Sequence, residues 1–398
     1  MILYFLRMSN KTLYDAKELR AALEFNAAEV LPGGDSLDEE LKSLVDNANN
    51  SGQPIRHYIG FEISGLIHIG TGIASALKIK KLTEAGVHCT IWLADYHTYL
   101  NNKLDGSYET IRFVARNYFA PVMSRCMEVV GCDMNLVSIL YAEETYDTKK
   151  GGISFWEYDL ACGKQLTLSR VMKSVSIMGK EAGSSVDFGT LRYPVMQVAD
   201  AFFLGAHIVH AGMDQRKSHV LMREVAMNLD PKYSLSIADL QIKPIAMHHD
   251  LLLSLEPPKE GEDKEGAKMS KSKPDYAIWV HDDRDELFRK LKKAYCPMPE
   301  GLSENEIERI PLLQWARFMI YPAGQIITLK RKPEHGGDVS YSSYESLRQA
   351  YQAGDIHPLD LKSGVADTLA TWFSPIRQWV LSNPEGMNKV IEVKNTHK

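Results

Sequence analysis

Two short motifs combine glycines, hydroxyl groups, lysines and a histidine in a way that suits the binding of a triphosphate. The first spans residues 64–72 (SGLIHIGTG). Glycine lets the backbone approach a nucleotide closely, the N–H groups at a helix start attract phosphate, and His68 can donate a hydrogen bond to a phosphate oxygen. A capped helix start with an incidental histidine would look the same, so this motif carries little weight alone.

The second motif, residues 268–272 (KMSKS), follows a charged loop at 257–266. Its lysines and hydroxyls can wrap a triphosphate, and cations there stabilise the charge that grows on the leaving pyrophosphate. A solvated Lys/Ser turn is the ordinary alternative for such a loop. The order of the two motifs, each on a suitable element, is the specific signal. It predicts ATP-dependent chemistry with His68, Lys268 and Lys271 as catalytic residues.

Polar residues also interrupt the apolar run at 195–203 (VMQVADAFF). Tyr193 and Gln197 are spaced i, i+4, and Asp200 continues the same helix face, which by itself could be a polar stripe. Polar groups within so apolar a run need partners, which favours a ligand site.

The elements around the first motif form a strand–helix–strand unit. Residues 55–61 predict a short apolar strand, a helix follows from about residue 69 to 85, and residues 89–95 predict the next strand. The crossover of such a unit is right-handed and its strands are parallel. Ligands bind beyond the carboxyl ends of these strands, where residues 60–71 and 95–97 lie.

The two motifs resemble the HIGH and KMSKS signatures of class I aminoacyl-tRNA synthetases. The surrounding sequence is similar to the archaeal and eukaryotic type of tyrosyl-tRNA synthetases from about residue 55 to 375, whereas residues 1–50 and 105–185 match poorly. The resemblance rests on residues 58–62 (YIGFE), 93–101 (LADYHTYLN), 193–200 (YPVMQVAD), 212–217 (GMDQRK) and 356–362 (IHPLDLK).

This resemblance implies a role for each matched residue. The residues expected to bind tyrosine are Tyr58 and Asp200 at its phenol hydroxyl, Tyr193, Gln197 and Gln215 at its amino group, and Glu62, with Gly60, at the floor of the site. The residues expected to bind ATP are Gly60, His68, Gly70, Thr71, Gly212, Asp214, Lys268, Ser270, Lys271 and Ser272. The residues expected to contact tRNA are Arg216, Lys217, His335, His357 and Asp360, with Lys362 and the run 330–332 adding positive charge.

The resemblance further implies a two-step reaction. L-tyrosine and ATP would form tyrosyl-adenylate and pyrophosphate, and the tyrosyl group would pass to the 3' end of tRNA(Tyr). Mg²⁺ would accompany the ATP phosphates, with no metal bound by the protein itself. A homodimer is expected, with the inserted segment at the interface. Thr71 departs from the usual second histidine of the first signature.

Composition limits the other possibilities. The chain has 398 residues and a net charge of −5, so it is long enough for two or three domains and any contact with nucleic acid must be local. Its five cysteines form no C-x-x-C pair, which argues against zinc or disulfides and fits a reducing cytoplasm. No stretch of about 18 apolar residues occurs, so no membrane span is expected.

We therefore predict an α/β fold: a Rossmann-like catalytic domain built on a parallel sheet, with a helical insertion, and a C-terminal α-helical anticodon-binding domain. The expected parts are an N-terminal helical segment at 1–50, the catalytic domain at 51–245 with its insertion at about 105–185, a linker with the KMSKS loop at 246–310, and the helical domain at 311–398.

Two alternatives remain open at this point. A tryptophan-specific enzyme would share the fold but would need no hydroxyl-matching pair in its pocket. A catalytically silent relative that only binds RNA would have no use for the lysines of the 268–272 loop.

Overall fold

The computed structural model describes residues 13–178, 187–258, 268–269, 271 and 273–396. The chain divides into two compact units that each draw on several stretches of sequence. The first unit comprises Met1–Phe61, Lys81–Ala94 and Asp133–His249, and the second comprises Glu62–Lys80, Asp95–Cys132 and Asp250–Lys398. This division runs through the stretch predicted as one catalytic domain, because residues 62–80 and 95–132 pack with the C-terminal half.

A six-stranded sheet forms the centre of the first unit. Its strands are β1 (Ala27–Leu31), β10 (Ile245–His249), β7 (Ile208–Gly212), β2 (Arg56–Phe61), β3 (His88–Leu93) and β4 (Val137–Tyr141), in that spatial order. All neighbours except β1 pair in parallel. The predicted parallel sheet is confirmed, and β7 is buried throughout, as expected of a central parallel strand.

The edge strand β1 corrects the prediction that residues 1–50 are helical. Helices α1 (Ala16–Glu24) and α2 (Gly34–Ser51) are present, but β1 lies between them and pairs antiparallel with β10. Asn26, with φ of 48°, turns the chain out of α1. An unpaired sheet edge offers a row of backbone donors and acceptors, and pairing with β10 satisfies them. This tertiary contact overrides the local helical pattern.

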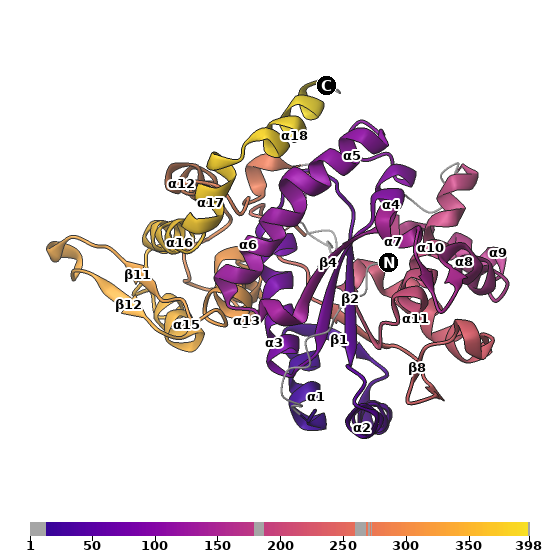
Figure 1. The fold of residues 1–398 in the computed structure, drawn as a ribbon. Helices are drawn as coiled ribbons and strands as arrows, with labels where there is room; N and C mark the ends of the chain where they lie inside the picture. The colour runs from indigo at the N-terminus through magenta and orange to yellow at the C-terminus, as the bar shows by residue number, and fades with distance from the viewer. Residues whose placement is uncertain (1–12, 179–186, 259–267, 270, 272, 397–398) are drawn as a thin grey trace. The chain divides into compact units, whose positions relative to one another are not determined.

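Helices cover the sheet of the first unit, and Figure 1 shows α8, α9, α10 and α11 gathered on one side of its strands. Asp187 accepts from the Thr190 N–H at the start of α10, and Gly205, with a left-handed φ of 66°, ends it. The remaining elements of this unit are η3 (Met134–Leu136), α7 (Ala142–Tyr146), α8 (Phe155–Gly163), α9 (Leu168–Ser174), η4 (Val175–Met178), α10 (Phe188–Leu204), η5 (Met213–Gln215), α11 (Arg216–Val225), η6 (Ala226–Asn228), η7 (Pro231–Tyr233) and the short ribbons β5 (Lys149–Lys150) with β6 (Ile153–Ser154) and β8 (Ser236–Ile237) with β9 (Leu240–Gln241). Helix α3 (Ser75–Glu84) begins in the second unit and ends in the first.

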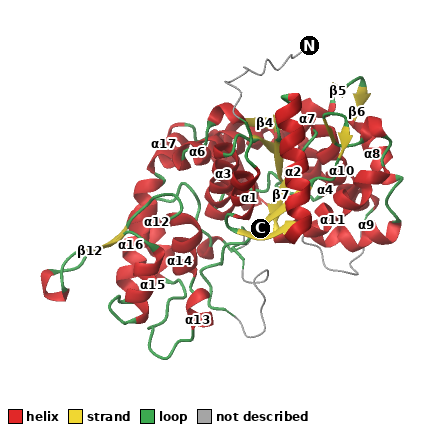
Figure 2. Cartoon of the chain, turned by 90° about the horizontal axis from the view of Figure 1, so that it is seen from below, coloured by secondary structure: helices red, strands yellow, loops and turns green. Residues whose placement is uncertain are grey.

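The second unit is mainly helical. Its elements are η1 (Gly70–Ala74), α4 (Asp95–Leu100), α5 (Tyr108–Val114), η2 (Ala115–Phe119), α6 (Ala120–Val130), η8 (Pro274–Tyr276), α12 (Arg284–Lys292), α13 (Glu304–Glu308), α14 (Pro311–Trp315), η9 (Ala316–Ile320), β11 (Ile327–Leu329), η10 (Pro333–His335), β12 (Val339–Tyr341), α15 (Tyr344–Gln352), α16 (Pro358–Trp372), α17 (Ser374–Ser382) and α18 (Glu385–Thr396). The helical C-terminal region is confirmed, with one addition: the β11–β12 hairpin extends from the helices around it (Figure 2).

Candidate functional site

The phenol-binding pair predicted from the sequence lies in the first unit. Tyr58 is on β2 and Asp200 is on α10, and both side chains are buried. Burial, followed by the charge of nearby Asp200, raises the pKa of the Tyr58 hydroxyl well above its usual value. The structure therefore brings the two side chains close enough to interact, and a donor and an acceptor share one buried region.

Asp200 has a further partner that sequence reasoning missed. The Tyr146 hydroxyl donates a hydrogen bond to Asp200 Oδ1 at 2.5 Å. Burial raises the pKa of Asp200 well above its usual value, while Tyr146 and Trp92 act in the opposite direction. The position of Tyr146 in the sequence could have indicated this contact. Tyr146 lies shortly after the carboxyl end of β4, and ligands of such folds bind beyond the carboxyl ends of the strands.

The residues predicted to hold an amino group are also brought together in this unit. Gln197 Nε2 donates to Gln215 Oε1 at 3.3 Å, and Gln215 Nε2 donates to the Ile177 carbonyl at 2.9 Å. Tyr193 lies one turn before Gln197 on α10 and is buried. The two amides thus meet near the end of β7, and amide groups can donate to or accept from a polar ligand.

Gly60 and Gly212 lie at the carboxyl ends of the neighbouring parallel strands β2 and β7. A Cβ at Gly60 would make only ordinary contacts, the nearest at 3.5 Å to Trp92 and Tyr58. Packing around a Cβ therefore does not by itself explain the glycine at this position. Asp214 follows Gly212 in η5, at the same edge of the sheet.

The first signature motif lies in the second unit, where the backbone locks the His68 ring. His68 Nδ1 accepts from the Gly70 N–H at 3.1 Å and the Thr71 N–H at 3.3 Å, so the ring proton is on Nε2, which lies 3.1 Å from Thr71 Oγ1. Burial, with Lys271 and Lys268 nearby, lowers the pKa of His68 to about 3. His68 is therefore a neutral donor through Nε2. A Cβ at Gly70 would lie 3.0 Å from the ring, which explains the glycine.

The second signature motif is held in the same unit by backbone pairing. Lys268 pairs with Leu253 in an isolated antiparallel bridge, and the Met269 N–H donates to the Leu252 carbonyl at 2.8 Å. Lys271 Nζ donates to Ser64 Oγ at 2.9 Å, which joins the second motif to the first. Burial lowers the pKa of Lys271 to about 8, although Glu62 opposes the shift. Ser270 and Ser272 lie outside the described residues.

Backbone hydrogen bonds also tie a segment that follows the second motif, residues 278–280, to the first motif. The Ile69 N–H donates to the Ile278 carbonyl at 3.0 Å, and the Val280 N–H donates to the Ile67 carbonyl at 3.1 Å. His68 and Trp279 form the bridge between these two bonds. Segments separated by about two hundred residues of chain are therefore joined, and Lys268 and Lys271 lie near enough to His68 to lower its pKa.

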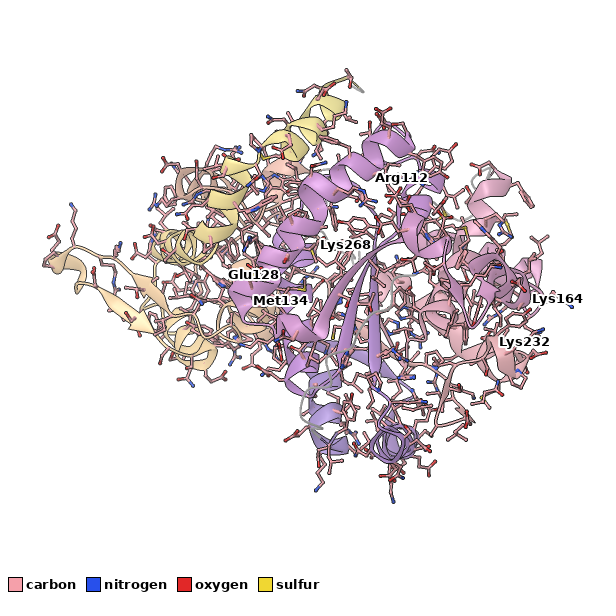
Figure 3. All side chains as sticks on the ribbon, in the orientation of Figure 1. Arg112, Glu128, Met134, Lys164, Lys232 and Lys268 are labelled. Carbon is pink, nitrogen blue, oxygen red and sulfur yellow. The ribbon has the colours of Figure 1, made fainter. Side chains whose placement is uncertain are left out.

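Glu62 and the segment after β3 belong to the same unit as the two motifs. Glu62 Oε1 accepts from Asn101 Nδ2 at 2.7 Å, and Lys103 Nζ lies 3.9 Å from Oε2. Asp95 Oδ2 accepts from Nε of Arg112, on α5, at 2.8 Å (Figure 3). His97 is buried in α4.

Each residue predicted to contact RNA has a different surrounding. Arg216 donates to both carboxylate oxygens of Glu29, and Lys217 Nζ donates to Ser176 Oγ at 2.7 Å. His357 is exposed at the start of α16, where its Nδ1 accepts from the Leu359 N–H, and Asp360 is partly exposed in the first turn.

Two of the remaining RNA predictions need comment. The expectation that Lys362 adds an exposed cation is wrong, because its side chain is buried and its Nζ donates to the Lys292 carbonyl at 3.1 Å. The helical period places Lys362 on the inner face of α16, against α12. The backbone of His335 lies in η10, but its side chain is outside the described part of the structure.

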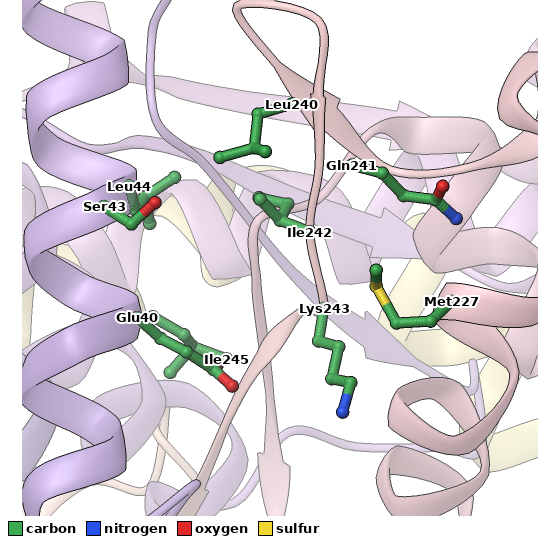
Figure 4. A pocket seen from close by; sticks show the side chains of 9 residues that line it. All are labelled: Glu40, Ser43, Leu44, Met227, Leu240, Gln241, Ile242, Lys243 and Ile245. Carbon is green, nitrogen blue, oxygen red and sulfur yellow. The ribbon is translucent and has the colours of Figure 1, made fainter.

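One cavity of the first unit lies away from all of these residues. It has a volume of about 320 Å³ (Figure 4) and is lined by Glu40, Ser43, Leu44, Met227, Leu240, Gln241, Ile242, Lys243 and Ile245. Ile245 is the first residue of β10 and pairs with the first residue of β7. The cavity therefore lies at the amino ends of these parallel strands, opposite to their carboxyl ends. Across the described residues, no three His, Cys, Asp or Glu side chains are arranged to hold a metal ion. No helix in the described ranges combines the length and apolar character needed to cross a membrane.

Comparison with known proteins gives a consistent result. Residues 49–374 match the family described as class I tRNA synthetases (W and Y). The chain is 42% identical over 369 residues to a tyrosine–tRNA ligase of Thermococcus sibiricus, which covers 90% of this chain and 94% of the relative. A tyrosine–tRNA ligase of Pyrococcus horikoshii is 42% identical over 356 residues, covering 87% of this chain and 92% of the relative.

Solved structures agree. The P. horikoshii tyrosyl-tRNA synthetase complexed with L-tyrosine superposes with a TM-score of 0.84 at 39% identity, covering 95% of this chain and 100% of that one. A tryptophanyl-tRNA synthetase from Aeropyrum pernix K1 has a TM-score of 0.62 at 15% identity, covering 90% of this chain and 84% of that one, and so shares the fold.

Proposed function

Because this chain belongs to the class I tRNA synthetases for tryptophan and tyrosine, we propose that it activates L-tyrosine with ATP and transfers it to tRNA(Tyr). One observation carries the choice of tyrosine: Tyr58 and Asp200 place a donor and an acceptor in one buried region. A phenol hydroxyl satisfies both groups. An indole side chain has only one N–H, a donor, and cannot.

The phenol pair would reject phenylalanine through the cost of unpaired polar groups. A phenylalanine ring would leave the hydroxyl of Tyr58 and the carboxylate of Asp200 buried without a ligand partner, at about 1–3 kcal/mol for each group. Tyr193, Gln197 and Gln215 would hold the substrate amino group, and Gly60 with Glu62 would form the floor of the site. The amide contact between Gln197 and Gln215 supports this assignment, because it orients both side chains in advance.

ATP would bind across the two signature motifs. The Nε2–H of His68 and the hydroxyl of Thr71 would face the phosphates beside Gly70, whose own N–H already donates to His68 Nδ1. Lys268, Ser270, Lys271 and Ser272 would form the cationic and hydroxyl clamp. Gly212 and Asp214 would face the ribose. The link from Lys271 to Ser64 supports the clamp, because it joins the two motifs before any nucleotide arrives.

The first reaction step is an in-line displacement. A carboxylate oxygen of tyrosine attacks the α-phosphorus of ATP, the bond to the bridging oxygen breaks, and pyrophosphate leaves. Mg²⁺ accompanying the ATP phosphates, and not held by the protein, would supply further positive charge. His68, Lys268 and Lys271 act by stabilising charge, so no side chain becomes covalently bonded. In the second step the terminal adenosine hydroxyl of the tRNA attacks the acyl carbon, and AMP leaves.

The tRNA would contact both units. Arg216 and Lys217 would meet the acceptor end, and His335, His357 and Asp360 would meet the anticodon. We also propose a homodimer that works in the cytoplasm. Exposed apolar side chains of the inserted segment support the dimer, because such side chains usually cover one another; they are Trp156 (45% exposed), Leu160 (64%), Leu168 (67%) and Met172 (44%).

The deciding experiment is amino-acid-dependent exchange of labelled pyrophosphate into ATP, with tyrosine, tryptophan and phenylalanine run in parallel. Exchange with tyrosine, and far less with the other two, is the expected result. Exchange driven by tryptophan would overturn the pocket assignment. Absence of exchange with all three amino acids would favour a protein that only binds RNA.

A further inference from the structure

The carboxylate assigned to the substrate hydroxyl already holds a phenol of the chain itself. Tyr146 donates to Asp200 Oδ1 at 2.5 Å, and its side chain is 3% exposed. A carboxylate has two oxygens in one plane, so a short bond to one of them fixes the direction of the other. Tyr146 therefore controls how Asp200 is presented.

Aromatic neighbours hold the Tyr146 ring rigidly. It stacks on Phe155, with ring centroids 3.5 Å apart and ring planes at 13°. Its ring centroid also lies 5.5 Å from that of Trp92 and 5.9 Å from that of Trp156. Tyr146 also ends α7, which begins directly after β4, so little backbone separates it from the sheet. A tyrosine packed on three sides cannot swing away from Asp200 without breaking these contacts.

We propose that Tyr146 is a positioning and specificity residue that orients the Asp200 carboxylate toward the hydroxyl of the substrate tyrosine. The inference rests on the proposed function and adds a residue to it. With Oδ1 held by Tyr146, the plane of the Asp200 carboxylate is restricted, and in that orientation it would accept the O–H of the substrate. Without that bond, the carboxylate can rotate within its buried space, and it loses a donor that stabilises its charged form.

The charge state of Asp200 links this geometry to selectivity. Burial raises the pKa of Asp200, and the Tyr146 hydroxyl opposes that rise. A carboxyl group that becomes protonated can donate as well as accept, so it no longer demands a donor from the ligand. Loss of the Tyr146 hydroxyl should therefore weaken the preference for tyrosine over phenylalanine, and most strongly at low pH.

The test compares two isosteric substitutions in the full chain. Tyr146→Phe keeps the ring and its stacking but removes the hydroxyl. Tyr158→Phe is the matched control, because Tyr158 is also a buried tyrosine of the first unit; its ring packs on Phe203, and its hydroxyl makes only a 3.4 Å bond to the Lys232 carbonyl. Thermal melts of both variants set an assay temperature at which each is folded.

Pyrophosphate exchange with tyrosine and with phenylalanine is then measured from acid to alkaline pH. For Tyr146→Phe we expect kcat/KM for tyrosine to fall about ten- to a hundredfold. The ratio of kcat/KM for tyrosine to kcat/KM for phenylalanine should fall by a similar factor. The acid limb of the pH profile of kcat/KM for tyrosine should move to higher pH, and the KM for ATP should stay the same. Tyr158→Phe should leave all four quantities unchanged.

The possible outcomes separate the inference from the proposed function. An unchanged ratio of tyrosine to phenylalanine in folded Tyr146→Phe would overturn the inference, as would an equal loss in Tyr158→Phe. If the wild-type protein exchanges with none of the amino acids, the proposed function itself fails, irrespective of the variants.

Discussion

The carboxylate of Glu29 accepts two hydrogen bonds from the guanidinium of Arg216: Oε2 accepts from Nε at 2.6 Å, and Oε1 accepts from Nη2 at 2.8 Å. Glu29 is on β1, the edge strand that the N-terminal segment adds to the sheet, and Arg216 begins α11. The same carboxylate lies 3.2 Å from His248 Nδ1, and His248 in turn contacts His219. The N-terminal segment thus orients a residue that is proposed to contact tRNA.

Arg216→Ala should weaken the transfer step alone. Loss of a charged contact to phosphate is expected to lower kcat/KM for tRNA about tenfold and to reduce its salt dependence, while pyrophosphate exchange stays at the wild-type level. The matched control is Arg223→Ala. Arg223 is on the same helix and is also held by both oxygens of a glutamate, Glu40. Equal effects of the two substitutions on tRNA kinetics would contradict the assignment.

Tyr58→Phe should reduce discrimination in the activation step. Removing one of the two groups that match the substrate hydroxyl is expected to lower the tyrosine-to-phenylalanine ratio of kcat/KM by about 1–3 kcal/mol in transition-state free energy. Tyr14→Phe serves as the control, since the Tyr14 hydroxyl only accepts from the Ile55 N–H at 3.0 Å. A ratio that survives Tyr58→Phe would count against this phenol pocket.

The pH dependence of ATP use should report Lys271. Its pKa is lowered from 10.5 to about 8, so the amine is charged below that pH and becomes neutral above it. A neutral amine cannot stabilise pyrophosphate, and kcat/KM for ATP reports the free enzyme, so this quantity should fall above about pH 8.

Lys271→Arg should move this alkaline limb upward, because a guanidinium stays charged. If kcat/KM for ATP still falls at the same pH in Lys271→Arg, the titration of a group other than Lys271 causes the fall. His68, with a pKa of about 3, should contribute no limb between pH 5 and 7.

A buried ion pair in the second unit gives a prediction on stability. Lys290 Nζ lies 2.7 Å from Asp282 Oδ2, with side-chain exposures of 2% and 5%, and the same oxygen accepts from the Trp279 N–H beside His68. Lys290→Met should lower the free energy of unfolding by about 3–5 kcal/mol, because it leaves a buried carboxylate without its cation. Guanidinium unfolding measures this change.

The pH dependence of that loss provides the check. The pKa of Asp282 is already raised to about 6 by burial, and removing Lys290 must raise it further. Protonation then removes the uncompensated charge, so the penalty should be smaller at pH 5 than at pH 8. The double variant Lys290→Met/Asp282→Asn should recover part of the stability, and a penalty independent of pH would show that lost packing, and not charge, is responsible.

Much of the proposed chemistry could be inferred from local sequence, because the relevant interactions act over short stretches of chain. The sequence alone shows the glycines around His68, the i, i+4 spacing of Tyr193 and Gln197, and the lysines of the 268–272 loop. The strand–helix–strand pattern also predicts that the first motif directly follows the carboxyl end of a parallel strand, since right-handed crossover leaves few arrangements.

Contacts between distant segments were decided only by the tertiary structure. The sequence by itself determined which residue types were available, their order and the faces on which they could lie. It did not determine that β1 would pair with β10, that Tyr146 would reach Asp200, that Glu29 would hold Arg216, or that Lys362 would turn inward to the Lys292 carbonyl. Each of these contacts depends on how whole helices and strands pack. Two side chains from distant segments can meet only when burial of the hydrophobic faces of their elements brings those elements together.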